Sequence, residues 1–221
     1  LSSYGVTTYF STYRDSFKIN DLEAHNIVGY LEGIDSILKR EVVVIGAHYD
    51  HIGFRARPVE NDTIANGAND NASGTATVLA MAKYFGAMKN NKRSIIFALF
   101  TAEEMGLRGS RHLAERLATE KLNLYTMINF EMMGVPFLDK DYQVFATGYD
   151  LSNMAEVLNK YAGNKLVGKS EEAAKFNLFK RSDNYAFYEQ FNIAAQTISS
   201  CDLTNFDFYH HVDDESDKLD Y

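Results

Sequence analysis

The sequence predicts an α/β protein whose central sheet is mixed, mostly parallel and covered by helices on both faces. Four apolar, β-branched runs lack polar alternation and therefore suit strands that are buried on both sides; they are residues 41–47, 94–100, 125–130 and 193–198. Other stretches carry apolar residues at helical spacing, namely residues 73–88, 107–117, 151–161 and 182–190. Strands that alternate with helices in this way indicate a three-layer α/β/α sandwich.

Three further strand candidates are less regular. Residues 143–147 form a short apolar run, and residues 6–10 and 26–31 have the pattern of half-exposed strands at the edge of a sheet. Ser73 is expected to be the N-cap of the helix that follows it. No linker, repeat or low-complexity segment divides the sequence, so we expect one domain over residues 1–221.

The composition excludes several classes of protein. Hydrophobic residues make up 46% of the 221 residues, enough for a sizeable core, and no apolar run approaches the roughly 20 residues of a membrane-spanning helix. The net charge of -8 argues against a nucleic-acid partner, because binding to a phosphate backbone relies on a basic surface. The single cysteine, Cys201, excludes an internal disulfide and a cysteine zinc site. Any metal must therefore have oxygen and nitrogen ligands.

The chain begins with Leu1 rather than methionine, so we expect a mature or trimmed chain. No signal segment is visible, and the sequence does not tell whether one, or another amino-terminal part, was removed. One cysteine is compatible with either an oxidising or a reducing compartment. We expect an exported protein that is periplasmic, secreted or surface-anchored, and the cytoplasm is the alternative. The sequence does not indicate an oligomeric state.

Five segments with carboxylate or imidazole side chains follow predicted strands or lie near the carboxyl end of the chain. They carry His48 and Asp50; Asp70; Glu103 and Glu104; Glu131; and Tyr209 with His210. Ligands of open α/β sheets bind beyond the carboxyl ends of the strands, so we expect these side chains to converge. Clustered carboxylates repel one another unless cations neutralise them. The pattern therefore predicts a metal site, with two metals sharing one carboxylate.

Each segment taken alone also has a structural interpretation. His48 can belong to a simple ion pair, and Asp70 can cap the helix that follows it. Glu103 and Glu104 can be solvated residues in the first turn of a helix, where acidic side chains are favourable. His51 is interpreted as a loop residue outside the site.

Two adjacent imidazoles compete for the role of ligand near the carboxyl end. His210 or His211 can bind a metal, or both can be loop residues. Asp213, Asp214 and Glu215 are interpreted as the acidic start of a final helix.

Taken together in this order, the segments resemble the dizinc aminopeptidases of metallopeptidase family 28, of the bacterial leucyl aminopeptidase type. The match spans nearly the whole chain, and its motifs are NIVGYLEG at 26–33, GAHYDH at 46–51, GANDNASG at 67–74, AEEMGL at 102–107, RSD at 181–183 and YHHVDD at 209–214. The resemblance implies the zinc aminopeptidase/phosphorylase-like fold and a single catalytic domain. It also implies hydrolysis of the amino-terminal peptide bond of peptides with a free amino terminus.

The resemblance implies a ligand set for two Zn²⁺ ions per chain. His48 and Glu131 would hold one ion, Glu104 and His210 would hold the other, and Asp70 would bridge them. Glu131 is a departure, because the family usually has Asp at this position. The family pattern also implies a strained peptide bond after Asp70, cis as in relatives.

The remaining roles follow from the same resemblance. Glu103 would be the general base, and Tyr209 would donate a hydrogen bond to the developing oxyanion. Asp50 would support the imidazole of the preceding histidine from behind. Arg181 and Asp183 would line the substrate cleft.

Two other functions stay open. A glutaminyl-peptide cyclase, which is a single-zinc acyltransferase, has the same fold, but the complete second ligand set favours the peptidase. A catalytically inactive peptidase-like binding domain would have lost its ligands, whereas every ligand position here carries a competent side chain.

Overall fold

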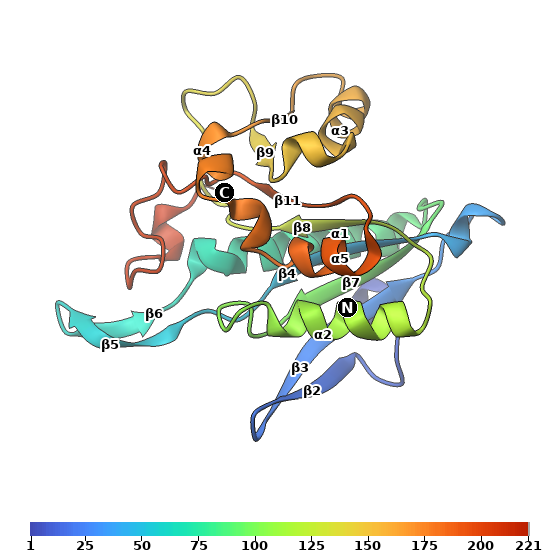
Figure 1. Cartoon of the computed structure of the whole chain (residues 1–221), viewed down its shortest axis with the longest axis horizontal. Helices are drawn as coiled ribbons and strands as arrows, with labels where there is room; N and C mark the ends of the chain where they lie inside the picture. The colour runs from blue at the N-terminus through green and yellow to red at the C-terminus, as the bar shows by residue number, and fades with distance from the viewer. Residues whose placement is uncertain (221) are drawn as a thin grey trace.

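The computed structural model describes residues 1–220, apart from the side chains of residues 55–57. Its main sheet has nine strands: β1 (Thr7–Thr8), β2 (Arg14–Ile19), β3 (Leu22–Leu31), β4 (Val42–His48), β7 (Ser94–Phe100), β8 (Leu124–Phe130), β9 (Val144–Ala146), β10 (Val167–Gly168) and β11 (Ala195–Ser199). Their order across the sheet is β1-β3-β7-β4-β8-β11-β9-β10, and β2 pairs with β3. β5 (Gly53–Val59) and β6 (Asp62–Ala65) form a separate hairpin that projects from the body of the molecule (Figure 1).

The centre of the main sheet is parallel. β4 pairs in parallel with both β7 and β8, and β11 pairs in parallel with β8. These four strands are the four unbroken apolar runs of the sequence, and β7 has the predicted bounds. The pairs of β3 with β1, β2 and β7 are antiparallel, as is the pair of β11 with β9. The predicted mixed sheet is therefore confirmed.

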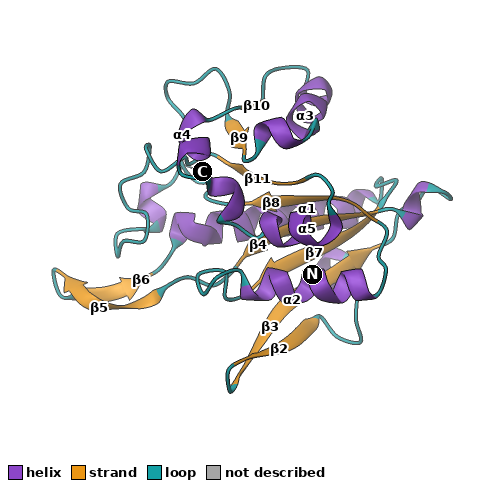
Figure 2. Cartoon of the chain, viewed as in Figure 1, coloured by secondary structure: helices purple, strands orange, loops and turns teal. Residues whose placement is uncertain are grey.

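Helices lie on both faces of this sheet (Figure 2). They are α1 (Gly74–Met88), α2 (Arg108–Thr119), α3 (Met154–Ala162), α4 (Glu171–Lys175) and α5 (Asn184–Phe191). Alternate side chains of β4 show how the faces are divided. Ile45 packs in one core with Val78 of α1, whereas Val44 packs in another with Leu113 of α2 and Phe187 of α5. The predicted three-layer sandwich is confirmed.

Several predicted details are wrong. Residues 26–31 do not form an edge strand, because β3 lies inside the sheet and Val28 has no exposed surface. Only Thr7–Thr8 of the predicted strand 6–10 pairs. Ser73 does not cap α1, because its backbone is already helical and its hydroxyl donates to the carbonyl of Asn69. Residues 213–215 do not begin a helix, since only a short 3-10 turn follows, at Ser216–Lys218.

Among residues 1–220, none of the helices combines the length and the apolar character that a membrane crossing requires.

Candidate metal centre

Three neighbouring parallel strands bring acidic and imidazole side chains to one edge of the sheet. β4 ends at His48, and β8 is followed directly by Glu131. β7 is followed by the turn that carries Glu103 and Glu104. The predicted convergence of these segments therefore occurs, because parallel strands place their carboxyl ends at the same edge.

Several residues other than glycine have a left-handed backbone conformation at this edge. Ala102 precedes the two glutamates with φ 55°, Met132 follows Glu131 with φ 51°, and His210 itself has φ 56°. Such conformations are uncommon for side chains with a Cβ and cluster at functional sites. They turn each segment sharply where its functional side chain must face the cluster.

The loop that carries Asp70 is fixed by hydrogen bonds from two other segments. The carboxylate of Asp214 accepts from the backbone N–H groups of Asn69 at 2.7 Å and Asp70 at 3.0 Å. The side chain of Asn71 accepts from the backbone N–H of Met132 at 3.1 Å, which joins the loop to the end of β8. The peptide bond between Asp70 and Asn71 is cis, as the resemblance implied.

One group of potential ligands contains His48, Asp70 and Glu131. Their ligand atoms lie within 4.8 Å of one another. The Nε2 atom of His48 is 3.3 Å from Oδ1 of Asp70, and both side chains are almost completely buried. These are the residues assigned to the first ion and the bridge in the sequence analysis.

Asp50 supports this group differently from the expectation. The Nδ1 atom of His48 is 3.0 Å from the backbone carbonyl of Asp50, whereas the carboxylate of Asp50 is 3.7 Å away. That carboxylate instead accepts a hydrogen bond from the backbone N–H of Glu103 at 3.1 Å. Asp50 therefore orients the histidine through its backbone and the turn of Glu103 through its side chain.

A second group surrounds the other oxygen of Asp70. The Nε2 atom of His210 is 3.3 Å from Oδ2 of Asp70 and 3.2 Å from Oε2 of Glu104. His51, which the sequence analysis placed outside the site, is also here, because its Nδ1 atom is 3.0 Å from Oε1 of Glu104. The group of His51, Asp70 and Glu104 has ligand atoms within 4.8 Å of one another.

His211 faces away from this cluster. Its Nδ1 atom accepts a hydrogen bond from the backbone N–H of Asp213 and lies 3.2 Å from the carboxylate of that residue. Of the two adjacent histidines, only His210 contacts Asp70 and Glu104. This arrangement agrees with the choice that the resemblance implied.

Several buried polar atoms of the cluster make no hydrogen bond. In the described part of the chain they include Nε2 of His48, both ring nitrogens of His51 and Oε1 of Glu104. Buried polar atoms without a partner are unfavourable, and each requires an explanation. Imidazole nitrogens and carboxylate oxygens are ligands of zinc. The residues present therefore fit bound metal ions, which would satisfy these atoms.

The electrostatics of the cluster reflect this crowding. Burial opposes ionisation of Asp70, but the imidazoles of His210 and His48 outweigh it and lower the pKa of this carboxyl. Burial opposes protonation of His210, but Asp70 and Glu104 outweigh it and raise its pKa to about 9. Burial raises the pKa of Glu131 to about 7. Without a metal, protons therefore neutralise part of the cluster, and cations would displace them.

Two further carboxyl groups near the cluster, those of Glu103 and Asp183, also have raised pKa values. Burial, followed by repulsion from Glu131 and Asp183, raises the pKa of Glu103 to about 10. Burial also raises the pKa of Asp183 to about 6. Asp183 has no exposed surface, so it does not line the substrate cleft as expected. Its carboxylate acts on Glu103 from the interior instead.

A buried serine holds the carboxylate of Glu131 by a hydrogen bond. Ser182 donates a hydrogen bond to the carboxylate of Glu131, and the amide of Asn129 donates to the hydroxyl of Ser182 at 2.7 Å. Both partners are buried. Their contribution was missed in the sequence analysis, and the one available signal was the position of Ser182 within the RSD motif.

Tyr209 and Arg181 border a small cavity beside the cluster. The cavity has a volume of about 40 Å³, and Glu131 and Ser182 also line it. The guanidinium of Arg181 donates to the hydroxyl of Tyr209 at 3.3 Å. The ring of Tyr209 stacks on that of His210, with 4.0 Å between the centroids.

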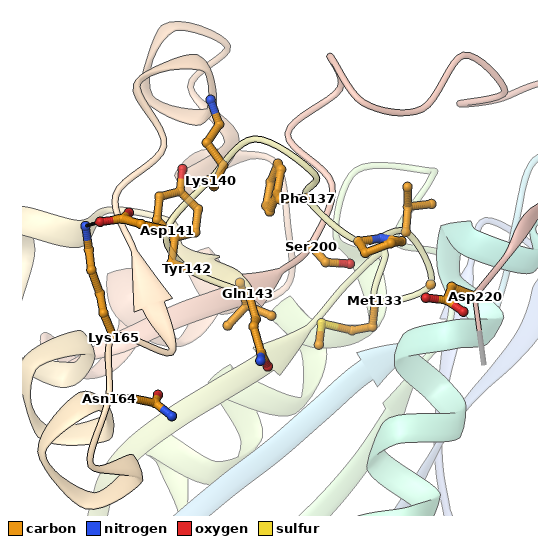
Figure 3. A pocket seen from close by; sticks show the side chains of 14 residues that line it. Met133, Phe137, Lys140, Asp141, Tyr142, Gln143, Asn164, Lys165, Ser200 and Asp220 are labelled. Atoms are coloured by element: carbon orange, nitrogen blue, oxygen red, sulfur yellow. Dashed lines mark hydrogen bonds and ion pairs between the residues drawn. The ribbon is translucent and has the colours of Figure 1, made fainter.

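A larger cavity lies away from the cluster. It has a volume of about 700 Å³ and is lined by residues 133–137, 140–144 and 164–165 with Ser200 and Asp220 (Figure 3). Lys165 and Asp141 form an ion pair at its wall, with 2.7 Å between the charged atoms (Figure 3). None of the clustered ligands lines it. Its size therefore does not make it the active site.

Residues 26–221 match the family model described as peptidase family M28. The chain therefore belongs to this family, as the resemblance implied.

Three similar proteins illustrate the relationship. Aminopeptidase YwaD of Bacillus subtilis is 34% identical over 112 residues, which are 50% of this chain and 22% of that protein. The solved structure of BSAP, a zinc aminopeptidase from Bacillus subtilis, superimposes with a TM-score of 0.70 at 24% identity and covers 91% of this chain and 47% of that one. The Porphyromonas gingivalis glutaminyl cyclase superimposes with a TM-score of 0.69 at 18% identity and covers 99% and 80%.

These similarities cover only part of the related proteins and do not identify the reaction. The chain spans about a fifth of the length of the curated relatives that it matches. Peptidase and cyclase structures superimpose on it almost equally well, so the fold does not distinguish between the two reactions.

Proposed function

We propose that this chain is the catalytic domain of a zinc-dependent aminopeptidase, which removes the amino-terminal residue of peptides. The observation that carries the proposal is the position of Asp70. Its Oδ1 atom is 3.3 Å from His48 and its Oδ2 atom is 3.3 Å from His210. One carboxylate is thus shared by two ligand sets, which supports two zinc ions per chain.

The proposed sets are His48, Asp70 and Glu131 for one ion, and Asp70, Glu104 and His210 for the other. When bound, zinc supplies a water of lowered pKa and polarises the carbonyl of the scissile bond. The sets contain only nitrogen and oxygen ligands, and both lie where open α/β sheets bind their ligands.

The side chains around these sets supply the proton transfers. Glu103 is the proposed general base. Bound cations would favour its ionised form, so that it would take a proton from the attacking water and return it to the leaving amine. Asp50 holds the turn of Glu103 through the backbone N–H. Tyr209, beside Glu131 in the cavity wall, is the proposed hydrogen-bond donor to the oxyanion. Arg181 holds the tyrosine hydroxyl in place.

The shape of the surroundings supports cleavage after a single residue. On the side of Glu131 and Tyr209 the cavity has a volume of only about 40 Å³. On the side of Glu104 a groove of about 450 Å³ is lined by His51 and Met105. We infer that the amino terminus of the peptide lies on the closed side, near Glu131, and that the rest of the peptide leaves through the groove. The surplus of carboxylates favours a protonated amino terminus over a blocked one.

A glutaminyl-peptide cyclase is the second candidate, because a protein with that name shares the fold. The second ligand set, Glu104 and His210 on the far oxygen of Asp70, favours the peptidase, since a cyclase needs one zinc.

One substrate panel separates these functions. The zinc-loaded protein is incubated with a leucine-leading peptide, its N-acetylated form and a glutamine-leading peptide, and the products are identified by mass spectrometry. Release of the first residue from the free peptide alone supports the aminopeptidase. Loss of ammonia from the glutamine-leading peptide would support the cyclase. No reaction with any peptide would support an inactive binding domain.

A further inference from the structure

His51 is the member of the cluster that none of the roles above uses. It lies three residues beyond the end of β4, its side chain is 7% exposed, and its ring centroid is 5.6 Å from that of His210. Its Nδ1 atom is 3.0 Å from Oε1 of Glu104 and 3.9 Å from Oδ2 of Asp70. A loop histidine that is buried among these groups requires an explanation.

The contact between His51 and Glu104 is not a hydrogen bond. Although the two atoms are 3.0 Å apart, neither Oε1 of Glu104 nor either ring nitrogen of His51 has a hydrogen-bond partner. His48 shows the same pattern, because its Nε2 atom is 3.3 Å from Asp70 and also lacks a partner. Atoms that are this close without pointing at each other are arranged like neighbouring ligands directed at a common third point.

The distances within the group fit a single ion. Zinc holds nitrogen and oxygen ligands at about 2.0–2.2 Å, so neighbouring tetrahedral ligands lie about 3.3–3.6 Å apart. The Nε2 atom of His210 is 3.2 Å from Glu104 and 3.3 Å from Asp70. The corresponding distances of His51 are 3.0 and 3.9 Å. His51 and His210 therefore each approach one oxygen of Glu104, and both face Oδ2 of Asp70.

The ring of His51 is held in this position by a glycine. A Cβ atom on Gly67 would lie 2.5 Å from Cγ of His51, and the φ of Gly67 is +68°. Both the close approach and the left-handed backbone require glycine. The loop before Asp70 therefore packs directly on the imidazole.

We propose that His51 is a metal ligand, so that one ion has four protein ligands, namely His51, Asp70, Glu104 and His210. The other ion then has three, His48, Asp70 and Glu131. This inference rests on the proposed dizinc site and adds a difference between its two halves.

The difference assigns separate roles to the two ions. Structural zinc sites are typically filled by four protein ligands, whereas catalytic sites have three and leave a position for water or substrate. By this pattern, the ion with four protein ligands would hold the site together, and the ion with three would keep a position for water or substrate.

Zinc affinity of the full chain tests this inference. The metal-free protein is titrated with zinc against a competing chelator, and both dissociation constants are measured for wild type, His51→Ala, His51→Gln and the control His211→Ala. We expect His51→Ala to weaken one zinc by more than about 100-fold, beyond the 10–100-fold of a supporting residue. The other zinc should change little. Glutamine, a poor zinc ligand that can still hydrogen-bond to Glu104, should not restore the affinity, and His211→Ala should match wild type.

Two results would overturn it. Unchanged affinities in His51→Ala would exclude His51 as a ligand, and full restoration by His51→Gln would reduce it to a residue that positions Glu104. If the variants do not fold, zinc X-ray absorption on the wild type decides, because the inference requires three imidazoles shared by two ions rather than two. A wild type that binds fewer than two zinc ions would instead refute the dinuclear site of the proposed function.

Discussion

Asp214 offers a quantitative test of how the bridging loop is held. Its carboxylate has no exposed surface and accepts from the backbone N–H groups of Asn69 and Asp70 at 2.7 and 3.0 Å. Asp214→Asn keeps the shape of the side chain but replaces one acceptor oxygen by an amide that faces an N–H group. Hydrogen bonds to a charged group contribute about 1.5–3 kcal/mol each, and an unsatisfied buried donor costs about 1–3 kcal/mol.

These contributions sum to a destabilisation of about 3 kcal/mol for Asp214→Asn. For a chain of this size, each kcal/mol lowers the melting temperature by about 2–4 °C, so a decrease of about 6–12 °C is expected. Differential scanning calorimetry of the metal-free protein measures it without the additional stabilisation that a bound ion provides.

The neighbouring aspartate is the matched control. Asp213 has a side chain that is 54% exposed and pairs with His211 at the surface, so Asp213→Asn should change the stability by less than about 0.5 kcal/mol. Zinc affinity of Asp214→Asn should decrease about 10–100-fold, because the loop that aims Asp70 is loosened. A melting temperature within about 2 °C of wild type would refute the idea that Asp214 fixes the loop.

Three further predictions concern the reaction and the metal. Glu103→Gln should lower kcat by about 10²–10⁴-fold with unchanged zinc content; a kcat within ten-fold of wild type would show that another group is the base. Tyr209→Phe should lower kcat by about 10²-fold at nearly constant KM, and a lower zinc content in this variant would indicate a structural role instead. The raised pKa of His210, about 9, keeps its ring protonated in the metal-free protein below that pH. Because zinc must displace this proton to bind, zinc affinity should rise with pH between pH 6 and 9, by about ten-fold per pH unit for each proton displaced. The same raised pKa stabilises the metal-free fold below pH 6.5, and this contribution disappears as the pH rises through about 9. Calorimetric titrations across this range should therefore detect protons that are released when zinc binds. A zinc affinity that does not change with pH would contradict the assignment of His210 as a ligand.

The sequence was sufficient to predict the parts of the molecule that depend on local pattern. Continuous apolar runs such as residues 94–100 can be buried on both faces only in the middle of a covered sheet. Residues that follow such strands, including His48 and Glu131, must then meet at one edge. The resemblance of the ordered motifs to a peptidase family then implied a role for each of these residues, which the strand pattern alone did not.

The features of the fold and the site that the sequence did not predict depend on contacts between residues far apart in the chain. β3 was mistaken for an edge strand, but the amide of its buried Asn26 donates hydrogen bonds to Asp15 and to the carbonyl of Gly109. His51 was dismissed because spacing after a strand does not give the direction of a loop, which here depends on the approach of Gly67. No local pattern shows that Asp214 reaches back to the loop of Asp70.

The central claim is that Asp70 is shared by two zinc ions. Metal content after zinc reconstitution and removal of loosely bound metal, measured by mass spectrometry, tests it most directly. Two zinc ions per chain are expected in the wild type and in His211→Ala, and a content that falls toward one is expected in Glu131→Ala and in His210→Ala. A wild type that retains one zinc or none, or two zinc ions that survive both substitutions, would contradict it.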